Sequence, residues 1–294
     1  MSLAHAVPAS GSTRAVAVLS LLKIFNALVP KDAGSRKIGR SIPFGDGPRQ
    51  RLDVYGPRSF GGALPVVFFI YGGSWSDGDR RNYDFAGRAI AALGYVTVIA
   101  DYRLLPEIEY PVFVEDCGTA FNWVTQNISR YGGDPARVGL MGHSAGAYNA
   151  VMLALHPRYR RAMTSPDSLR CVVGLSGPYD FFPFDGDISR RTFGAARDPE
   201  DTQPINHATP GSPPMLLATG DKDQLVSPRN TVALAARLNR AKVAVTEVHY
   251  PELGHPQILL ALSRPGRRLA PVLADVEVFL SANLRVDSRQ EMVG

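Results

Sequence analysis

Apolar residues along this chain gather in short continuous runs, and the stretches between them carry helical spacing. The runs predict buried strands at 66–70, 95–100, 138–141, 171–175, 215–218 and 243–249. Continuous runs of this kind are typical of a parallel sheet with both faces covered by helices. The spacing between the runs predicts helices at 113–130, 145–155, 231–239 and 269–282.

Strands and helices that alternate in this way predict an α/β fold class, with a mostly parallel central sheet and helices on both faces. Ligands of such folds bind beyond the carboxyl ends of the strands. One interval, 177–214, breaks the alternation because Pro, Gly and Asp are scattered among its aromatic residues. We expect it to form a small cap-like insertion of loops and short helices.

Four aromatic side chains of this insertion are candidates for lining a pocket: Tyr179, Phe181, Phe182 and Phe184. Large aromatic residues also serve to pack a short insertion onto the body of a protein. The sequence leaves both interpretations open.

The segment 15–29 is apolar on one helical stripe, formed by Val18, Leu22, Phe25 and Val29. We therefore predict an amphipathic helix that packs on the rest of the protein. A mobile cover over a functional site or a membrane-surface anchor is the alternative. The expected organisation is an N-terminal helical extension over 1–45 and one α/β domain over 46–294.

Of the 294 residues, 45% are hydrophobic and 20% are charged, a composition typical of a globular protein. The net charge is +5, but the basic residues are interspersed with acids, so a solvated surface and no nucleic-acid partner are expected. Cys117 and Cys171 lie in or beside apolar stretches and are expected to be buried free thiols. We also expect no stable membrane insertion and, without an evident export signal, a cytoplasmic location.

The chemistry of the chain begins with Gly142-His143-Ser144-Ala145-Gly146, which follows one predicted strand and opens a predicted helix. A strand, a sharp turn and a helix around G-x-S-x-G form the nucleophile elbow of a serine enzyme. The glycines are needed because the turn is crowded and strained. Ser144 is therefore the candidate nucleophile.

A serine hydroxyl needs a base to accept its proton. His255 follows the last predicted strand, from where its loop can reach back over the edge of the sheet. His143, inside the elbow, is better placed to line a substrate pocket, and His249 within a strand is expected to be a core residue. His255 is therefore the candidate base.

A third group must orient the imidazole of the base, and two aspartates compete for this role. Asp221 and Asp223 both follow the strand predicted at 215–218, at the same edge of the sheet. Asp221 is closer to the strand and is also suited to forming the turn, which favours Asp223. The chain order Ser144, Asp223, His255 is the order expected of an α/β-hydrolase.

Backbone amides must also stabilise the oxyanion that forms when a carbonyl is attacked. Tyr71-Gly72-Gly73-Ser74-Trp75 follows the first predicted strand, and its glycines leave the backbone unobstructed. The candidate donors are the amides of Gly73, Ser74 and Ala145, with Gly72 a weaker candidate. The candidates for lining the substrate pocket are Tyr71, Trp75, His143, Tyr179, Phe181 and Phe182.

Together these motifs resemble the carboxylesterase branch of the α/β-hydrolases, which includes hormone-sensitive-lipase-like, feruloyl-esterase-like and kynurenine-formamidase-like enzymes. The resemblance runs from Leu52 to the last predicted helix. It rests on the following stretches: Leu52-Asp53-Val54-Tyr55, Y-G-G-S-W, Asp101-Tyr102-Arg103-Leu104 with Pro106-Glu107, Glu115-Asp116, Y-G-G-D-P at 131–135, the elbow, G-D-K-D and Gly254-His255.

The resemblance implies Ser144, Asp223 and His255 as a catalytic triad, the Gly-Gly segment as the oxyanion hole, and no metal or organic cofactor. It suggests that Asp101, Arg103 and Glu107 have a structural role in fixing loops. This sequence departs from the family at Tyr71, where the family usually has histidine. That position is generally structural in the family, so the oxyanion hole is expected to be kept, with a donor from the phenol of Tyr71 as the alternative.

The expected function is hydrolysis of a small-molecule ester with a small to medium acyl group, through an acyl-enzyme intermediate, because Trp75, Phe181 and Phe182 suggest a confined pocket. Cleavage of an amide, an aryl formamide or a short peptide by the same residues is one alternative. A hydrolase-fold protein that binds a small molecule without turning it over is another. The oligomeric state stays open, a homodimer included.

Overall fold

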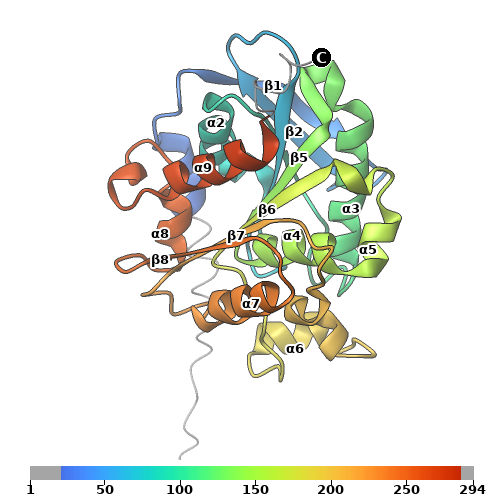
Figure 1. Ribbon diagram of the computed structural model, residues 1–294. Helices are drawn as coiled ribbons and strands as arrows, with labels where there is room; N and C mark the ends of the chain where they lie inside the picture. The colour runs from blue at the N-terminus through green and yellow to red at the C-terminus, as the bar shows by residue number, and fades with distance from the viewer. Residues whose placement is uncertain (1–20, 286–294) are drawn as a thin grey trace, which may run out of the picture.

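Most strands of the protein are short apolar segments with side chains buried on both faces. The computed structural model describes residues 21–285 and joins eight strands into one open sheet (Figure 1). They are β1 (Ser35–Pro43), β2 (Arg51–Pro57), β3 (Leu64–Ile70), β4 (Val96–Ala100), β5 (Gly133–His143), β6 (Leu169–Leu175), β7 (Met215–Gly220) and β8 (Val245–Tyr250). Their order is β1-β2-β4-β3-β5-β6-β7-β8, and β3 to β8 are parallel to one another.

Helices cover both faces of this sheet, which confirms the predicted fold class. The α-helices are α2 (Asp84–Ala92), α3 (Val112–Asn127), α4 (Ala145–Leu155), α5 (Pro157–Ala162), α6 (Asp187–Phe193), α7 (Arg229–Arg240), α8 (His255–Leu260) and α9 (Val272–Leu284). Figure 1 shows α8 and α9 on one side of β6 to β8, with α4 and α7 on the other. Every residue of α4 is buried, so the helix after the elbow is held firmly in the core.

Two strands, β1 and β2, were not predicted from the sequence. β1 is an edge strand in which polar and charged residues are interspersed, and β2 holds Asp53 among its buried residues. Both run antiparallel to their neighbours, and neither is a continuous apolar run. The segment expected to be a helical extension, 1–45, therefore includes the first strand of the sheet.

Residues 21–28 are helical, and the predicted apolar stripe faces the body of the protein in this part. Leu22 and Val29 are buried, and the ring of Phe25 packs edge-on against Phe85, with 5.3 Å between ring centroids. Val18 and the rest of 1–20 lie outside the described residues. Leu21, Ile24 and Leu28, on an adjacent face of this helix, are exposed.

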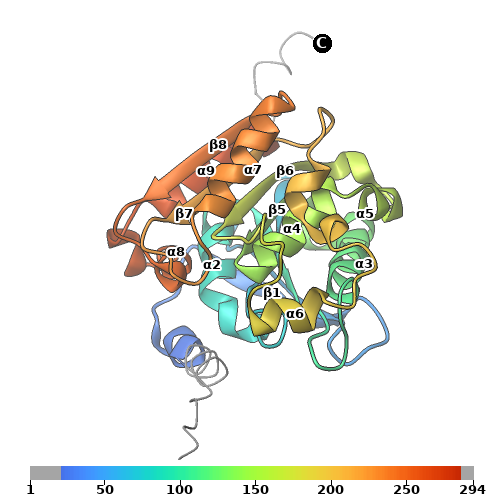
Figure 2. The same ribbon diagram turned by 90° about the horizontal axis from the view of Figure 1, so that it is seen from below.

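The segment 177–214 connects β6 to β7 and consists of loops, α6 and two short 3-10 helices (Glu200–Thr202 and Pro204–His207). Figure 2 shows α6 and its flanking loops beside α3 and α4. The segment is fixed to α4 by Tyr148, whose hydroxyl donates to the carbonyl of Thr202 at 2.8 Å and whose ring lies 5.3 Å from that of Phe193. The aromatic residues of this segment therefore pack it onto the body.

Cys117 and Cys171 are buried and free, as predicted. Among residues 21–285, the structure contains no helix with the length and apolar character needed to cross a membrane.

Candidate active site

The predicted elbow joins β5 to α4, and Ser144 lies in the sharp turn between them. Its φ of 57° and ψ of −125° are strained for a residue with a side chain. A Cβ on Gly142 would lie 2.2 Å from the carbonyl oxygen of Gly146, and one on Gly146 would lie 2.0 Å from that of Ile70. Only glycine therefore fits at both positions of the motif.

Parallel strands bring the three predicted side chains together at one edge of the sheet. Ser144 follows β5, Asp223 follows β7, and His255 begins α8 shortly after β8. Nε2 of His255 lies 2.8 Å from Oγ of Ser144, and its Nδ1 lies 2.8 Å from Oδ2 of Asp223. The result is a continuous hydrogen-bonded chain from hydroxyl to carboxylate.

The carboxylate end of this chain is buried and held by the backbone. Oδ1 of Asp223 accepts hydrogen bonds from the amides of Leu225 and Val226, each at 2.9 Å. Burial acts to raise the pKa of Asp223, but the hydrogen bond and charge of His255 and these two amides outweigh it and lower the pKa below its ordinary value. The group therefore stays ionised and can orient His255.

The competing carboxylate, Asp221, faces a different histidine. Its Oδ1 lies 2.8 Å from Nδ1 of His249, whose Nε2 lies 2.8 Å from Oε1 of Glu247. His249 was expected in the core, and this prediction is wrong because β8 is an edge strand that leaves its side chain about one third exposed. The geometry thus separates the roles of the two aspartates.

The segment Tyr71–Gly78, here called the oxyanion segment, follows β3 and lies against the elbow. A Cβ on Gly72 would be 2.8 Å from both the Cβ of Ser144 and the carbonyl oxygen of His143. Within residues 21–285, the amides of Gly72, Gly73 and Ser74 have no hydrogen-bond acceptor. The amide of Ala145 lies in the first turn of α4, where the helix offers no acceptor. In the described part of the chain, these four amides are therefore left without an acceptor.

His143 is buried beside the candidate base. Its Nε2 lies 3.1 Å from the backbone oxygen of His255, and the two imidazole centroids are 4.9 Å apart. Because a carbonyl only accepts hydrogen bonds, Nε2 of His143 carries the proton. Burial, followed by the proximity of His255, lowers the pKa of His143 to about 3, so its ring is neutral at ordinary pH.

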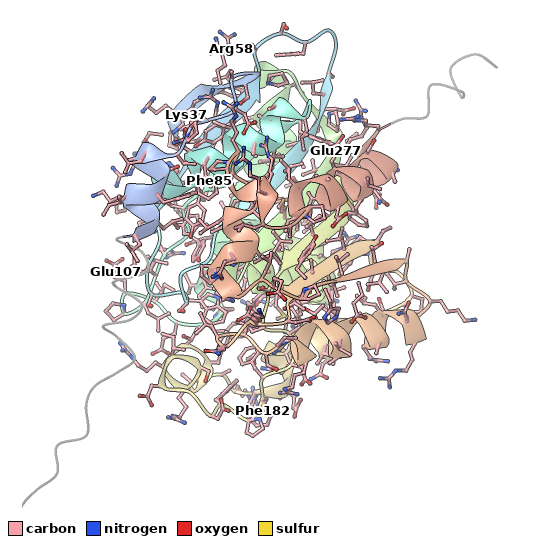
Figure 3. All side chains as sticks on the ribbon, turned by 90° about the vertical axis from the view of Figure 1, so that its left-hand side faces the viewer. Lys37, Arg58, Phe85, Glu107, Phe182 and Glu277 are labelled. Carbon is pink, nitrogen blue, oxygen red and sulfur yellow. The ribbon has the colours of Figure 1, made fainter. Side chains whose placement is uncertain are left out.

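Most aromatic candidates for the substrate pocket are packing residues. Tyr71 and Tyr179 have no exposed surface, so the prediction that they line an open pocket is wrong. Trp75 is buried among other rings, and its indole N–H donates to Oδ1 of Asn149 at 3.0 Å. Phe181 is half-buried, whereas Phe182 is 37% exposed on the outer surface of the insertion (Figure 3). The buried members of this set thus pack the insertion and the oxyanion segment, whereas Phe182 lies at the surface.

The hydroxyl of Tyr71 is part of a buried polar cluster behind the oxyanion segment. It donates to Oδ1 of Asp101 at 2.8 Å and accepts from Nη2 of Arg49 at 2.9 Å. Asp101 also forms an ion pair with Arg80, which in turn contacts Asp53 at 3.2 Å. The charges of Asp101 and Asp53 are thereby compensated in the core.

Two other charged residues of the same motif behave differently. Arg103 forms an ion pair with Asp116 at 2.8 Å, which attaches the loop after β4 to α3. The side chain of Glu107 makes no hydrogen bond or ion pair with any residue in the described range 21–285 and points outward (Figure 3). A structural role therefore fits Asp101 and Arg103, but not Glu107.

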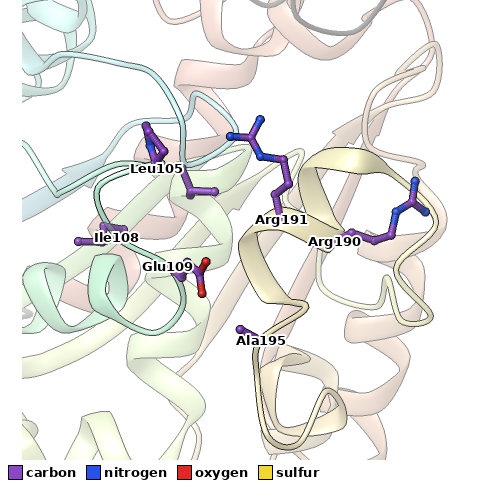
Figure 4. A pocket seen from close by; sticks show the side chains of 7 residues that line it. Leu105, Ile108, Glu109, Arg190, Arg191 and Ala195 are labelled. Carbon is purple, nitrogen blue, oxygen red and sulfur yellow. The ribbon is translucent and has the colours of Figure 1, made fainter.

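A hollow of about 260 Å³ lies between the loop after β4 and α6 (Figure 4). Its lining residues are Leu105, Pro106, Ile108, Glu109, Arg190, Arg191 and Ala195. Neither Ser144 nor His255 lines it, so it is separate from the hydrogen-bonded chain.

Within the described part of the chain, His156, Asp201 and His207 have the composition of a metal site. However, Nδ1 of His156 accepts a hydrogen bond from the amide of Arg158 at 3.1 Å, so its Nε2 carries the proton toward Asp201, 3.0 Å away. A histidine ligand needs the reverse arrangement, with a bare nitrogen toward the metal. Hydrogen bonds among the three residues instead attach the insertion to the end of α4.

Comparisons with known proteins agree with this geometry. The BD-FAE family model matches residues 52–238, more than half of the chain. Esterase LipC of Mycobacterium tuberculosis is 30% identical over 82% of this chain and 64% of its own length. Isoprenylcysteine alpha-carbonyl methylesterase ICME of Arabidopsis thaliana is 35% identical over 50% of this chain and 36% of its own length. The chain thus spans less than two thirds of either relative.

Solved esterase structures share the fold. Esterase B from Lactobacillus rhamnosis superimposes with a TM-score of 0.79, covering 95% of this chain and 96% of that one at 18% identity. EstE1, a thermophilic carboxylesterase from a metagenomic library, gives a TM-score of 0.76 with 96% and 100% covered at 22% identity. The chain has the α/β-hydrolase fold and belongs to the BD-FAE family.

Proposed function

We propose that this protein is a serine hydrolase that cleaves carboxylic esters of small molecules through an acyl-enzyme intermediate. The observation that carries the proposal is the unbroken chain of hydrogen bonds from Ser144 through His255 to Asp223. The esterase names of LipC and ICME support ester hydrolysis as the reaction.

In the first step, Oγ of Ser144 attacks the ester carbonyl while Nε2 of His255 takes the hydroxyl proton. The negative charge of Asp223 stabilises the imidazolium and holds its Nδ1–H in place. The amides of Gly72, Gly73, Ser74 and Ala145 supply donors for the oxyanion.

The tetrahedral intermediate then collapses: His255 gives its proton to the departing alkoxide, which leaves as the alcohol, and Ser144 stays acylated. In the second half of the reaction, water attacks the acyl group while His255 takes one of its protons. His255 then returns this proton to Oγ of Ser144 as the acid leaves, which restores the serine.

Esters are favoured over amides because the relatives carry esterase names, although the same residues are suited to both bonds. Trp75, within the oxyanion segment, packs against the rings of Phe113, Tyr148 and Phe193, and we propose that this cluster limits the acyl group to a small or medium size. A series of p-nitrophenyl esters from acetate to palmitate tests this: activity should peak at the short end. A maximum at palmitate would contradict the confined pocket.

The role of Ser144 is tested by Ser144→Ala, which should lower kcat by roughly five orders of magnitude. Ser176→Ala is a matched control, because Ser176 follows the neighbouring strand β6 and also has positive φ. It should keep activity within about threefold of wild type. A Ser144→Ala enzyme with substantial activity would refute the proposal.

A fluorophosphonate probe separates an enzyme from a hydrolase-fold protein that only binds its ligand. Folded wild-type protein should be labelled at Ser144, and failure to label would favour the binding protein. The cytoplasmic location and the oligomeric state stay predictions.

A further inference from the structure

The carbonyl groups of the oxyanion segment are held from behind by two tyrosine hydroxyls. The hydroxyl of Tyr102 donates to the carbonyl of Tyr71 at 3.0 Å, and that of Tyr83 donates to the carbonyl of Gly72 at 3.1 Å. The next carbonyl, that of Gly73, accepts the amides of Ser76 and Asp77 within the turn. Three successive carbonyls are therefore fixed.

Fixing a carbonyl also fixes the amide that follows it. The C=O of one residue and the N–H of the next share a planar trans peptide group and point in opposite directions. The bond from Tyr102 thus orients the N–H of Gly72, and the bond from Tyr83 orients the N–H of Gly73. These are amides for which residues 21–285 offer no acceptor.

The two tyrosines are themselves held rigidly. Both rings stack on that of Tyr71, with centroid distances of 5.1 Å to Tyr83 and 4.9 Å to Tyr102. Tyr71 is fixed in turn by Asp101 and Arg49. All three rings are buried, and burial raises the pKa of each phenol, so the hydroxyls stay protonated donors.

We propose that Tyr83 and Tyr102 are positioning residues that aim the amides of Gly73 and Gly72 at the oxyanion. The proposal rests on the proposed function, because ester hydrolysis supplies the oxyanion that these amides would bind. An oxyanion exists only in the tetrahedral transition state and intermediate, so misdirected amides raise the barrier without weakening substrate binding. Tyr71, which stands where the family usually has histidine, serves as the central ring of the stack.

The test is Tyr83→Phe and Tyr102→Phe, which delete only the hydroxyls. Tyr159→Phe is the matched control, because Tyr159 is buried and its hydroxyl bonds Tyr110 at 3.1 Å, not the oxyanion segment. Activity toward p-nitrophenyl butyrate and inhibition by a trifluoromethyl ketone, whose serine adduct carries an oxyanion, are measured for all three.

For the first two variants we expect kcat to fall about tenfold with KM within twofold, less than the loss of a whole donor. The inhibition constant of the ketone should rise by a similar factor, and Tyr159→Phe should match wild type in both. A purely structural role would lower the melting temperature of the variants but leave kcat and the inhibition constant of the folded enzyme unchanged.

Wild-type kcat and ketone affinity in both folded variants would overturn the proposal, as would equal losses in Tyr159→Phe. The Ser144→Ala control keeps this failure distinct from failure of the proposed function. If Ser144→Ala is inactive and the tyrosine variants are normal, only the positioning role is wrong. If Ser144→Ala is active, the proposed function itself is wrong.

Discussion

Two aspartates separated by a single residue face different histidines. Asp223 turns inward to His255 and is buried, whereas Asp221 stays at the surface with His249. The difference arises because two backbone amides, those of Leu225 and Val226, hold the carboxylate of Asp223. The same residue type therefore has two roles that are set by local backbone geometry.

Asp223→Asn should lower kcat by about a thousandfold or more, because an amide favours the wrong tautomer of His255 and cannot stabilise its charge. Asp221→Asn is the matched control and should change kcat less than threefold. Both are measured with p-nitrophenyl acetate, together with the rate of fluorophosphonate labelling. Equal losses in the two variants would contradict the assigned roles.

At the level of single residues, those that lie within a recognisable sequence motif could be predicted. Ser144, His255 and Asp223 each follow a strand, and their chain order limits the alternatives. The contacts of the tyrosines behind the oxyanion segment could not be predicted: Tyr83 belongs to no motif, and the motif that holds Tyr102 does not show that its hydroxyl reaches Tyr71. Tyr71 and Tyr179 were misplaced because an aromatic residue after a strand serves equally well in a pocket wall or in the core.

At the scale of elements, continuous apolar runs identified the parallel strands and fixed the edge at which the site forms. Interspersed polar residues concealed β1 and β2, which run antiparallel. The short helix α8 was not predicted, and α6 was expected only as one of the short helices of the insertion, without bounds, because six or seven residues are too few for a helical period to emerge. The strand β8 is an edge strand, so its polar side chains reach solvent.

Two histidines that join elements should give opposite pH dependence of stability. Burial acts to lower the pKa of His249, but hydrogen bonds to Glu247 and Asp221 outweigh it and raise the pKa. The stability that protonated His249 adds to the folded state is fully present below about pH 6.5. It is lost as the pH rises through the higher pKa of the folded protein. For His207, burial lowers the pKa, so stability is lost instead as the pH falls below about 6.5.

The melting temperatures of His249→Gln and His207→Gln, compared with wild type between pH 5 and pH 8.5, test this expectation. His249→Gln should be most harmful at the acid end and His207→Gln at the alkaline end. The effect of His249 should be about 0.5 kcal/mol or less, since its side chain is partly solvated. Differences that do not change with pH would contradict the expectation.

At the scale of the whole molecule, one buried ionic cluster connects the antiparallel edge of the sheet to the oxyanion segment. Arg80 joins Asp53 of β2 to Asp101, which follows β4 and binds Tyr71. Lys37 of β1 completes the cluster through Asp53 at 2.8 Å. Burial acts to raise the pKa of Asp53, but the bond from Lys37, the amide of Ser41 and the nearby charges lower it.

The consecutive residues Arg80 and Arg81 allow a direct test of this cluster. The side chain of Arg80 is 9% exposed, whereas that of Arg81 is 72% exposed and pairs with Asp79. Arg80→Leu removes the cation that two buried carboxylates share, leaving Asp53 with Lys37 and Asp101 with the more distant Arg49. It should cost about 3 kcal/mol of unfolding free energy. Arg81→Leu removes only a solvated pair and should cost less than about 1 kcal/mol.

Urea unfolding measures the loss of unfolding free energy in both variants. Ester hydrolysis, measured at urea concentrations well below the unfolding midpoint, shows whether the substitution also affects the active site. Because Asp101 holds Tyr71, Arg80→Leu should also lower kcat in the fraction that remains folded, whereas Arg81→Leu should not. If the two variants lose equal stability, the buried pairs contribute no more than a surface pair. If Arg80→Leu loses stability but keeps full kcat, the cluster supports the sheet without controlling the oxyanion segment.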